Sequence, residues 1–140
     1  MHNVDYVNTF ILVADDTAAS HGAEPPVREP NPSIPARQFA MIRDHPYRYT
    51  SGDVIFDVYA DRAGIPHSQR AAARDEYFSK GRPCLRASDL GKKYGWGIHC
   101  DGKGRLALYA VESPDYSALV QKGERDGTPA LVKAMRSSRK

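Results

Sequence analysis

The chain has 140 residues, of which 41% are hydrophobic and 26% are charged, and its formal net charge is +3. This length suits one domain, and the eight tyrosines and one tryptophan favour a folded chain over a disordered one. No apolar run approaches the roughly 18 residues of a transmembrane helix, so we expect no membrane partner. The first residues also lack the basic and then apolar pattern of a signal peptide, which predicts a cytoplasmic protein.

The first third of the chain predicts a strand, a long loop and a helix. Strand-forming residues crowd the segment 6–13. The loop 17–35 holds five of the ten prolines and has no periodicity. Its composition is typical of a stiff surface connector, and a lid or a tethered arm remains an alternative. Ser33 with Pro35 predicts the next helix start, and Pro46 predicts its end.

The segment 53–63 gives the clearest helix signal. Thr50 and Asp53 have the spacing of a capping box, and Gly64 suits a left-handed helix end. A second helix is predicted over 67–80. The first helix carries aspartates at intervals of four residues, which we interpret as a solvated face rather than a cation site. They are Asp53, Asp57 and Asp61.

The helices 53–63 and 67–80 also have the turn spacing of helix-turn-helix proteins, so DNA binding is one alternative function. The second helix carries Arg70 and Arg74, which could contact phosphates. The acidic residues beside these arginines, and the aspartates of the first helix, would repel a DNA backbone. An ordinary helical hairpin explains the same residues, and we expect no nucleic-acid partner.

A β-hairpin is predicted within residues 94–111. A loop of two or of four residues gives the same register, which pairs Trp96 with Tyr109 and His99 with Leu106. Because side chains alternate along a strand, this register places His99 and Leu106 on one face and Trp96 and Tyr109 on the other.

The C-terminal part predicts two more helices. The sequence from Ser113 to Asp115 is a strong helix start, and Gly123 predicts the end of that helix. A last short helix is predicted from Thr128. We expect the tail 136–140 to be frayed.

Positive charge gathers at residues 79–105, where seven Lys and Arg residues face two aspartates, a local net charge of +5. Such a segment is either a solvated face or a patch that receives an anion. The glycines around Trp96 would let a ligand come close to the backbone. The candidate ligand-binding residues are Arg82, Arg86, Lys93, Trp96 and His99.

Cys84 lies between Arg82 and Arg86, whose charges would favour its thiolate. With His99 as a base, Cys84 could act as a nucleophile, and a buried structural cysteine is the alternative. Cys100 adds no disulfide or C-x-x-C motif, and a zinc site lacks a fourth ligand. We expect no metal and no cofactor, because no phosphate loop or dinucleotide fingerprint is present.

Two segments are specific enough to compare with known families, Ser79–Arg86 and Lys93–His99. Together with shorter stretches at 8–11, 49–54 and 107–109, they resemble a family of small bacterial proteins filed as a domain of unknown function. The resemblance implies a single-domain bacterial protein and carries over no activity and no catalytic residue.

We therefore expect an α+β fold in one domain, 1–140: a small antiparallel sheet of the N-terminal strand and the hairpin, packed by four or five helices. The basic segment 82–93, which we expect to be irregular, should lie against the hairpin, with Arg86 near His99 and a hollow between them. The leading functional hypothesis is non-enzymatic binding of a small anionic ligand or a protein partner through residues 82–99. A thiol-dependent enzyme using Cys84 with His99 is the second hypothesis.

Overall fold

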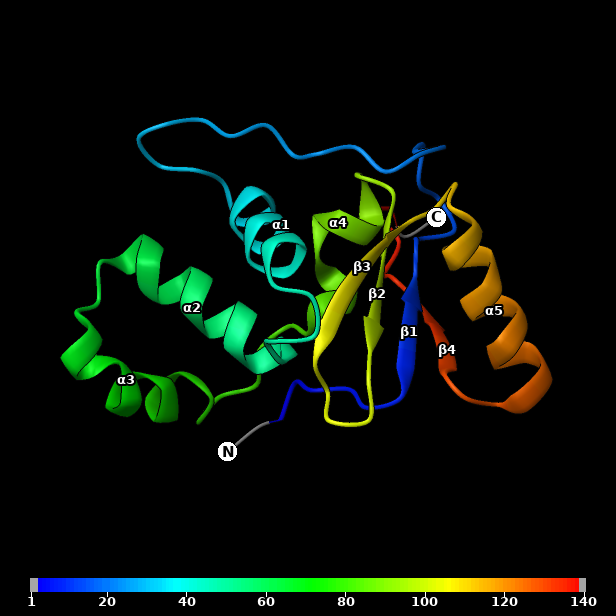
Figure 1. The fold of residues 1–140 in the computed structure, drawn as a ribbon. Helices are drawn as coiled ribbons and strands as arrows, with labels where there is room; N and C mark the ends of the chain where they lie inside the picture. The colour runs from blue at the N-terminus through cyan, green and yellow to red at the C-terminus, as the bar shows by residue number, and fades with distance from the viewer. Residues whose placement is uncertain (1–2, 139–140) are drawn as a thin grey trace.

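A four-stranded sheet lies at the centre of the computed structural model, which describes residues 3–138 (Figure 1). The strands are β1 (Thr9–Leu12), β2 (Trp96–Cys100), β3 (Leu106–Ala110) and β4 (Ala130–Lys133). Their order in the sheet is β3-β2-β1-β4. β1 pairs antiparallel with β2 and parallel with β4, so the sheet is mixed rather than antiparallel throughout.

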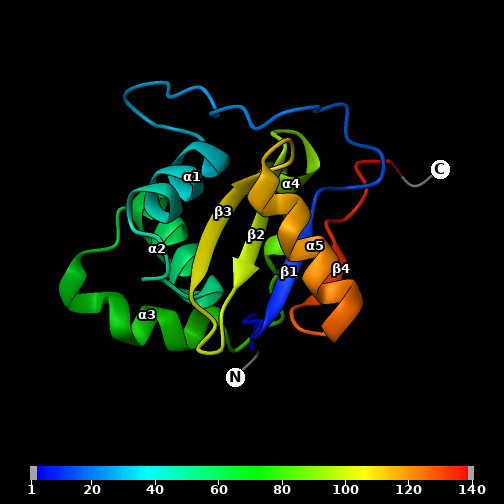
Figure 2. The same cartoon turned by 45° about the vertical axis from the view of Figure 1, so that its right-hand side comes forward.

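Helices cover both faces of this sheet. The helices are α1 (Ile34–Asp44), α2 (Ser51–Ala63), α3 (Arg70–Tyr77), α4 (Asp89–Lys92) and α5 (Pro114–Asp126). Of these, α3 packs on α2 rather than on the sheet (Figure 1). Residues of α1, α2 and α4 pack on the face that carries Ile11 and Ile98. α5 lies on the other face, where Tyr116 contacts Phe10 (Figure 2). The predicted α+β fold is confirmed.

The helix starts follow the capping signals of the sequence. The Ser33 hydroxyl accepts a hydrogen bond from the backbone of Ala36, and Thr50 and Asp53 form a reciprocal capping box. Gly64 ends α2 in the left-handed conformation at φ 70°. These contacts lie within one turn of the chain, which explains why the sequence predicted them.

Three other stretches differ from their prediction. α5 continues past Gly123, its predicted end, to Asp126 and is closed by Gly127 in the left-handed conformation at φ 76°. The segment 82–93, predicted to be irregular, contains a 3₁₀ turn at Leu85–Ala87 followed by α4. The short helix predicted from Thr128 is wrong, because this segment forms β4. Pro129 suits the first turn of a helix and also the residue before a strand. Pairing with β1 decides that this segment is a strand and not a helix. β1 lies inside the sheet and needs backbone partners on both of its edges, and β4 supplies the second.

The predicted hairpin register is wrong by one residue. Asp101 donates its N–H to the carbonyl of Arg105, and Gly104 has φ 77°, so the loop has three residues with a left-handed glycine at its end. Trp96 therefore pairs with Ala110, and His99 pairs with Ala107. An odd loop length moves the side chains of one strand to the opposite face relative to the other strand.

The proline-rich loop forms a strap, residues 17–32, that runs across the molecule from the end of β1 to α1 (Figure 1). The indole Nε1 of Trp96 donates to the carbonyl of Ala23 at 2.9 Å. At the far end, Arg62 of α2 donates to the carbonyl of Pro32 at 2.9 Å. The strap is thus tied to the sheet at one end and to α2 at the other.

The C-terminal tail meets the end of β1. Ser137 and Ser138 donate their backbone N–H groups to the carboxylate of Asp16, and residues 139–140 of the predicted frayed tail lie outside the described residues. Within residues 3–138, no helix combines the length and the apolar composition that crossing a bilayer requires.

Candidate functional site

The predicted pair of Cys84 and His99 is not assembled, because the two residues lie on opposite faces of the sheet. The ring of His99 makes an edge contact with Phe10 on the face under α5. Leu85, which follows Cys84, packs with Ile98 in the core on the other face. The expected contact between segment 82–93 and His99 is therefore wrong, because the segment packs on the Ile98 face while His99, the next residue of β2, points to the opposite face.

The predicted basic side chains bind separate parts of the protein. Arg82 stacks on the ring of Tyr77, with its guanidinium carbon 4.0 Å from the ring centroid. Arg86 donates to the carbonyl of Lys133 at 2.7 Å. Lys93 lies 4.0 Å from the carboxylate of Asp89. The structure does not bring these cations together around one anion position.

Trp96 is half-buried, and protein groups pack on its ring. Its ring contacts Phe39, with centroids 5.2 Å apart. A Cβ atom on Gly22 of the strap would lie 2.9 Å from the indole, so the strap packs directly on it. A Cβ on Gly97 would lie 2.6 Å from the ring of Phe10. Close approach of protein groups therefore accounts for these glycines.

His99 belongs to a polar cluster on the α5 face of the sheet. The hydroxyl of Tyr47 lies 2.9 Å from Nδ1 of His99 and 2.7 Å from the hydroxyl of Tyr109. Tyr47 reaches this position from a left-handed backbone conformation, φ 60°. Burial lowers the pKa of His99 and raises the pKa of Tyr47. The cluster is therefore held in its uncharged form, with its hydroxyls and Nδ1 paired.

The two arginines of the helix-turn-helix hypothesis form ion pairs within the protein. Arg70 pairs with Asp61 at 2.9 Å, and Arg74 pairs with Asp53 at 2.8 Å. Both acidic partners lie on α2, so the charges that would meet DNA phosphates are neutralised within the helix pair.

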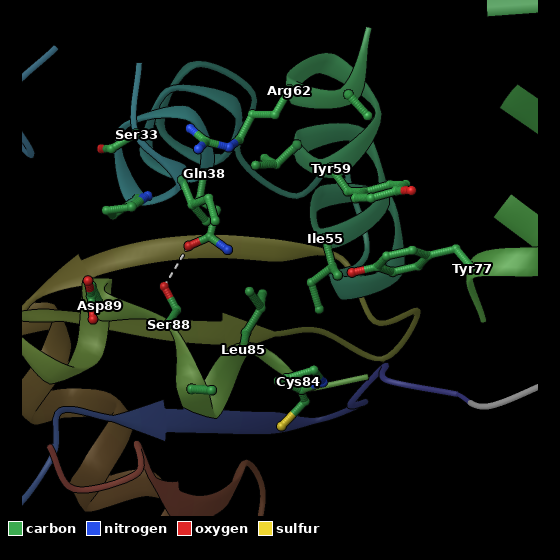
Figure 3. A pocket seen from close by; sticks show the side chains of 16 residues that line it. Ser33, Gln38, Ile55, Tyr59, Arg62, Tyr77, Cys84, Leu85, Ser88 and Asp89 are labelled. Atoms are coloured by element: carbon green, nitrogen blue, oxygen red, sulfur yellow. Dashed lines mark hydrogen bonds between the residues drawn. The ribbon is translucent and has the colours of Figure 1, made fainter. Parts of the chain in front are cut away.

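An open cleft of about 740 Å³ lies between α1, α2 and the segment 83–89 (Figure 3). Most of its wall is apolar or aromatic, and the main contributors are Ile34, Ile55, Val58, Tyr59, Tyr77 and Leu85. The rings of Tyr59 and Tyr77 lie 4.5 Å apart and form one side of it. Ile34 and Tyr59 remain 48% and 43% exposed at its rim, which leaves apolar surface in contact with solvent.

Gln38 and Ser88 form the buried polar pair of this cleft. The Ser88 hydroxyl accepts from the backbone N–H of Leu90 and lies 2.6 Å from Oε1 of Gln38. That distance is typical of an O–H donor, so Ser88 donates to the Gln38 oxygen. Within residues 3–138 the Gln38 amide nitrogen makes no hydrogen bond, and it faces the open cleft, where solvent reaches it (Figure 3).

Cys84 contributes to the wall of the cleft without presenting its thiol to it. Its sulfur points away from the cleft (Figure 3) and lies 3.3 Å from the hydroxyl of Tyr6. Burial, and next the contact with Cys84, raise the pKa of Tyr6. No base is within reach of the thiol among the described residues other than this neutral phenol.

Sequence reasoning missed the polar residues of the cleft, namely Gln38, Arg62 and Ser88. For Gln38 a signal exists, because it lies one turn before Ile42 and next to Phe39 on the apolar stripe of α1. A polar residue on a buried stripe requires a partner, and its site can be searched for. In the described part of the chain, no group of three or more His, Cys, Asp or Glu side chains is placed to hold a metal ion.

Comparisons with known proteins assign a family without an activity. Neither the curated proteins nor the solved structures give a match to the chain. A family model described as a family of unknown function (DUF6157) matches residues 1–140. The chain therefore belongs to this family of unknown function.

Proposed function

We propose that the protein binds a small, mainly apolar molecule in the cleft between α1 and α2. The volume of about 740 Å³ falls within the range of small-molecule sites, roughly 300–1,000 Å³. The observation that carries the proposal is the Gln38 amide nitrogen, a donor with no hydrogen-bond partner in the described part of the chain, in a cleft that is otherwise mostly apolar.

The exposed apolar rim supports the same conclusion. Removing apolar surface from water stabilises a complex by roughly 25 cal/mol per Å². Ile34 and Tyr59 stand open to solvent beside the cleft, so a ligand that covers them gains binding free energy. Such walls with few polar groups are typical of sites that hold an organic molecule and orient it by a small number of hydrogen bonds.

Enzymatic use of Cys84 gains no comparable support. A nucleophilic thiol needs a base within hydrogen-bond distance and an approach for the substrate. The Cys84 sulfur faces Tyr6, and His99 lies beyond the sheet. We therefore favour binding over catalysis.

The test uses anilinonaphthalene sulfonate, a dye whose fluorescence increases in apolar sites. We expect it to bind the wild-type protein, and Ala87→Trp, which fills the cleft, to weaken its binding at least about tenfold. Ala118→Trp places the same ring on the exposed surface of α5 and is the matched control. Equal dye binding by both variants, with both folded by circular dichroism, would overturn the proposal.

A further inference from the structure

We infer that the ligand of the α1–α2 cleft is a hydrophobic carboxylic acid, with its carboxylate bound by Gln38 and Arg62. The inference rests on the proposed function and adds the chemical class of the ligand. It follows from the direction of the hydrogen-bond donors in the cleft and from the charge beside them.

The orientation of Gln38 is the first step. Gln38 is only 6% exposed, and its side-chain oxygen accepts a hydrogen bond from the Ser88 hydroxyl. Because the Ser88 hydroxyl has donated its proton to that oxygen, the amide cannot rotate without breaking this bond. The amide nitrogen therefore presents its N–H donors to the cleft, and the group that binds there must be an acceptor.

Arg62 supplies the second donor and the positive charge. It lines the cleft on the side of α1 and donates one N–H to the carbonyl of Pro32. Its planar guanidinium has further N–H donors in a fork that matches a carboxylate. Figure 3 shows Gln38 and Arg62 on the same side of the cleft, with Arg62 above Gln38.

The remaining polar groups agree with an anionic ligand group. The first turn of α1, at Ser33 and Ile34, lines the same cleft, and the N-terminal end of a helix carries partial positive charge. Asp89 is the one carboxylate that lines the cleft within the described residues. Its nearest cation is Lys93 at 4.0 Å, and it lies apart from Arg62 in Figure 3.

The rest of the ligand must be apolar, because Ile55, Leu85 and the pair of Tyr59 and Tyr77 form the wall. An aromatic acid and a medium-chain fatty acid share this chemistry. Naphthoate and octanoate therefore serve as the two probes, and their relative affinity identifies the type of apolar body.

The experiment measures dissociation constants by displacement of anilinonaphthalene sulfonate from the folded protein. Naphthoate is compared with naphthylmethanol, which keeps the rings and lacks the charge. We expect the wild type to bind at least one of the two acids, and to bind naphthoate about tenfold or more tightly than the alcohol.

Gln38→Glu is the decisive variant. A carboxylate at this position still accepts from Ser88 but replaces the N–H donors by an anionic oxygen. We expect it to weaken naphthoate at least about tenfold and to favour the cation naphthylmethylamine instead. Gln121→Glu, an equal charge change on the exposed surface of α5, should leave both affinities unchanged.

The outcomes separate the two proposals. If naphthoate and naphthylmethanol bind with equal affinity, and Gln38→Glu changes neither affinity, the carboxylate inference fails. The proposed function still stands in that case, provided that Ala87→Trp weakens dye binding. If no probe binds in the cleft, both fail. Should Gln38→Glu unfold the protein, Arg62→Gln tests the same point. It must weaken the binding of naphthoate and leave the affinity for naphthylmethanol unchanged.

Discussion

The two faces of the sheet carry polar groups in opposite situations. On the α5 face, Tyr47 pairs with both His99 and Tyr109, so the cluster is closed on itself. On the other face, Gln38 is held by Ser88 at its oxygen and open at its nitrogen. Buried polar groups that are fully paired specify a structure, whereas one that is left open at a cleft points to a ligand.

The largest expected change in the free energy of unfolding comes from removing a buried side chain on the α5 face of the sheet. Phe10 is fully buried and its ring contacts His99, Tyr109 and Tyr116. Phe10→Ala should lower the free energy of unfolding by about 3–5 kcal/mol, measured by urea denaturation. Val7→Ala, at a site that is 56% exposed, is the control and should change it little. A cost below about 1 kcal/mol for Phe10→Ala would contradict the packing described.

A smaller effect is expected within the closed cluster. Tyr47→Phe removes the hydroxyl that bonds both His99 and Tyr109 and should cost about 2 kcal/mol in unfolding free energy. Tyr109→Phe removes one of these bonds and should cost about 1 kcal/mol. Equal costs in urea denaturation would show that Tyr47 is not the centre of the cluster.

The same cluster predicts how stability depends on pH. Burial lowers the pKa of His99 below its ordinary 6.5, so the unfolded chain binds a proton more readily than the folded protein. The contribution of His99 therefore lowers the unfolding free energy as the pH falls below about 6.5, until the folded protein also binds the proton. His99→Gln should make the decline between about pH 7.5 and pH 5 shallower. His67→Gln, at an exposed position, should keep the wild-type slope.

The smallest expected effect is on the rate at which the two cysteine thiols are modified. Cys100 is fully buried, and burial raises the pKa of its thiol to about 12, so iodoacetamide should not modify it in the folded protein. Cys84 is half-buried and should react slowly. Because the sheet separates the two side chains, His99→Ala should leave the rate at Cys84 unchanged. A large loss of rate, followed by mass spectrometry, would restore the thiol-enzyme hypothesis.

Sequence reasoning predicted the site poorly for a specific physical reason. Arg82, Arg86 and Lys93 are close in sequence, and this proximity made them look like one patch. Each reaches a different partner, because the chain turns between them through a 3₁₀ turn and a short helix. Gln38 and Arg62 are far apart in sequence, and only the packing of α1 against α2 brings them to one cleft.

The sequence by itself determined the features that depend on neighbours within a turn: the caps at Ser33 and Thr50, the left-handed glycine after α2, and the α+β class. The tertiary structure decided the hairpin register, the conversion of the last segment to β4, and the position of the cleft. Local hydrogen bonds are fixed by adjacent residues, while strand pairing and helix packing depend on surfaces contributed by distant segments. The three-residue loop before Arg105 was enough to place Ala107 and Tyr109, rather than Leu106 and Leu108, on the face of the hairpin that carries His99.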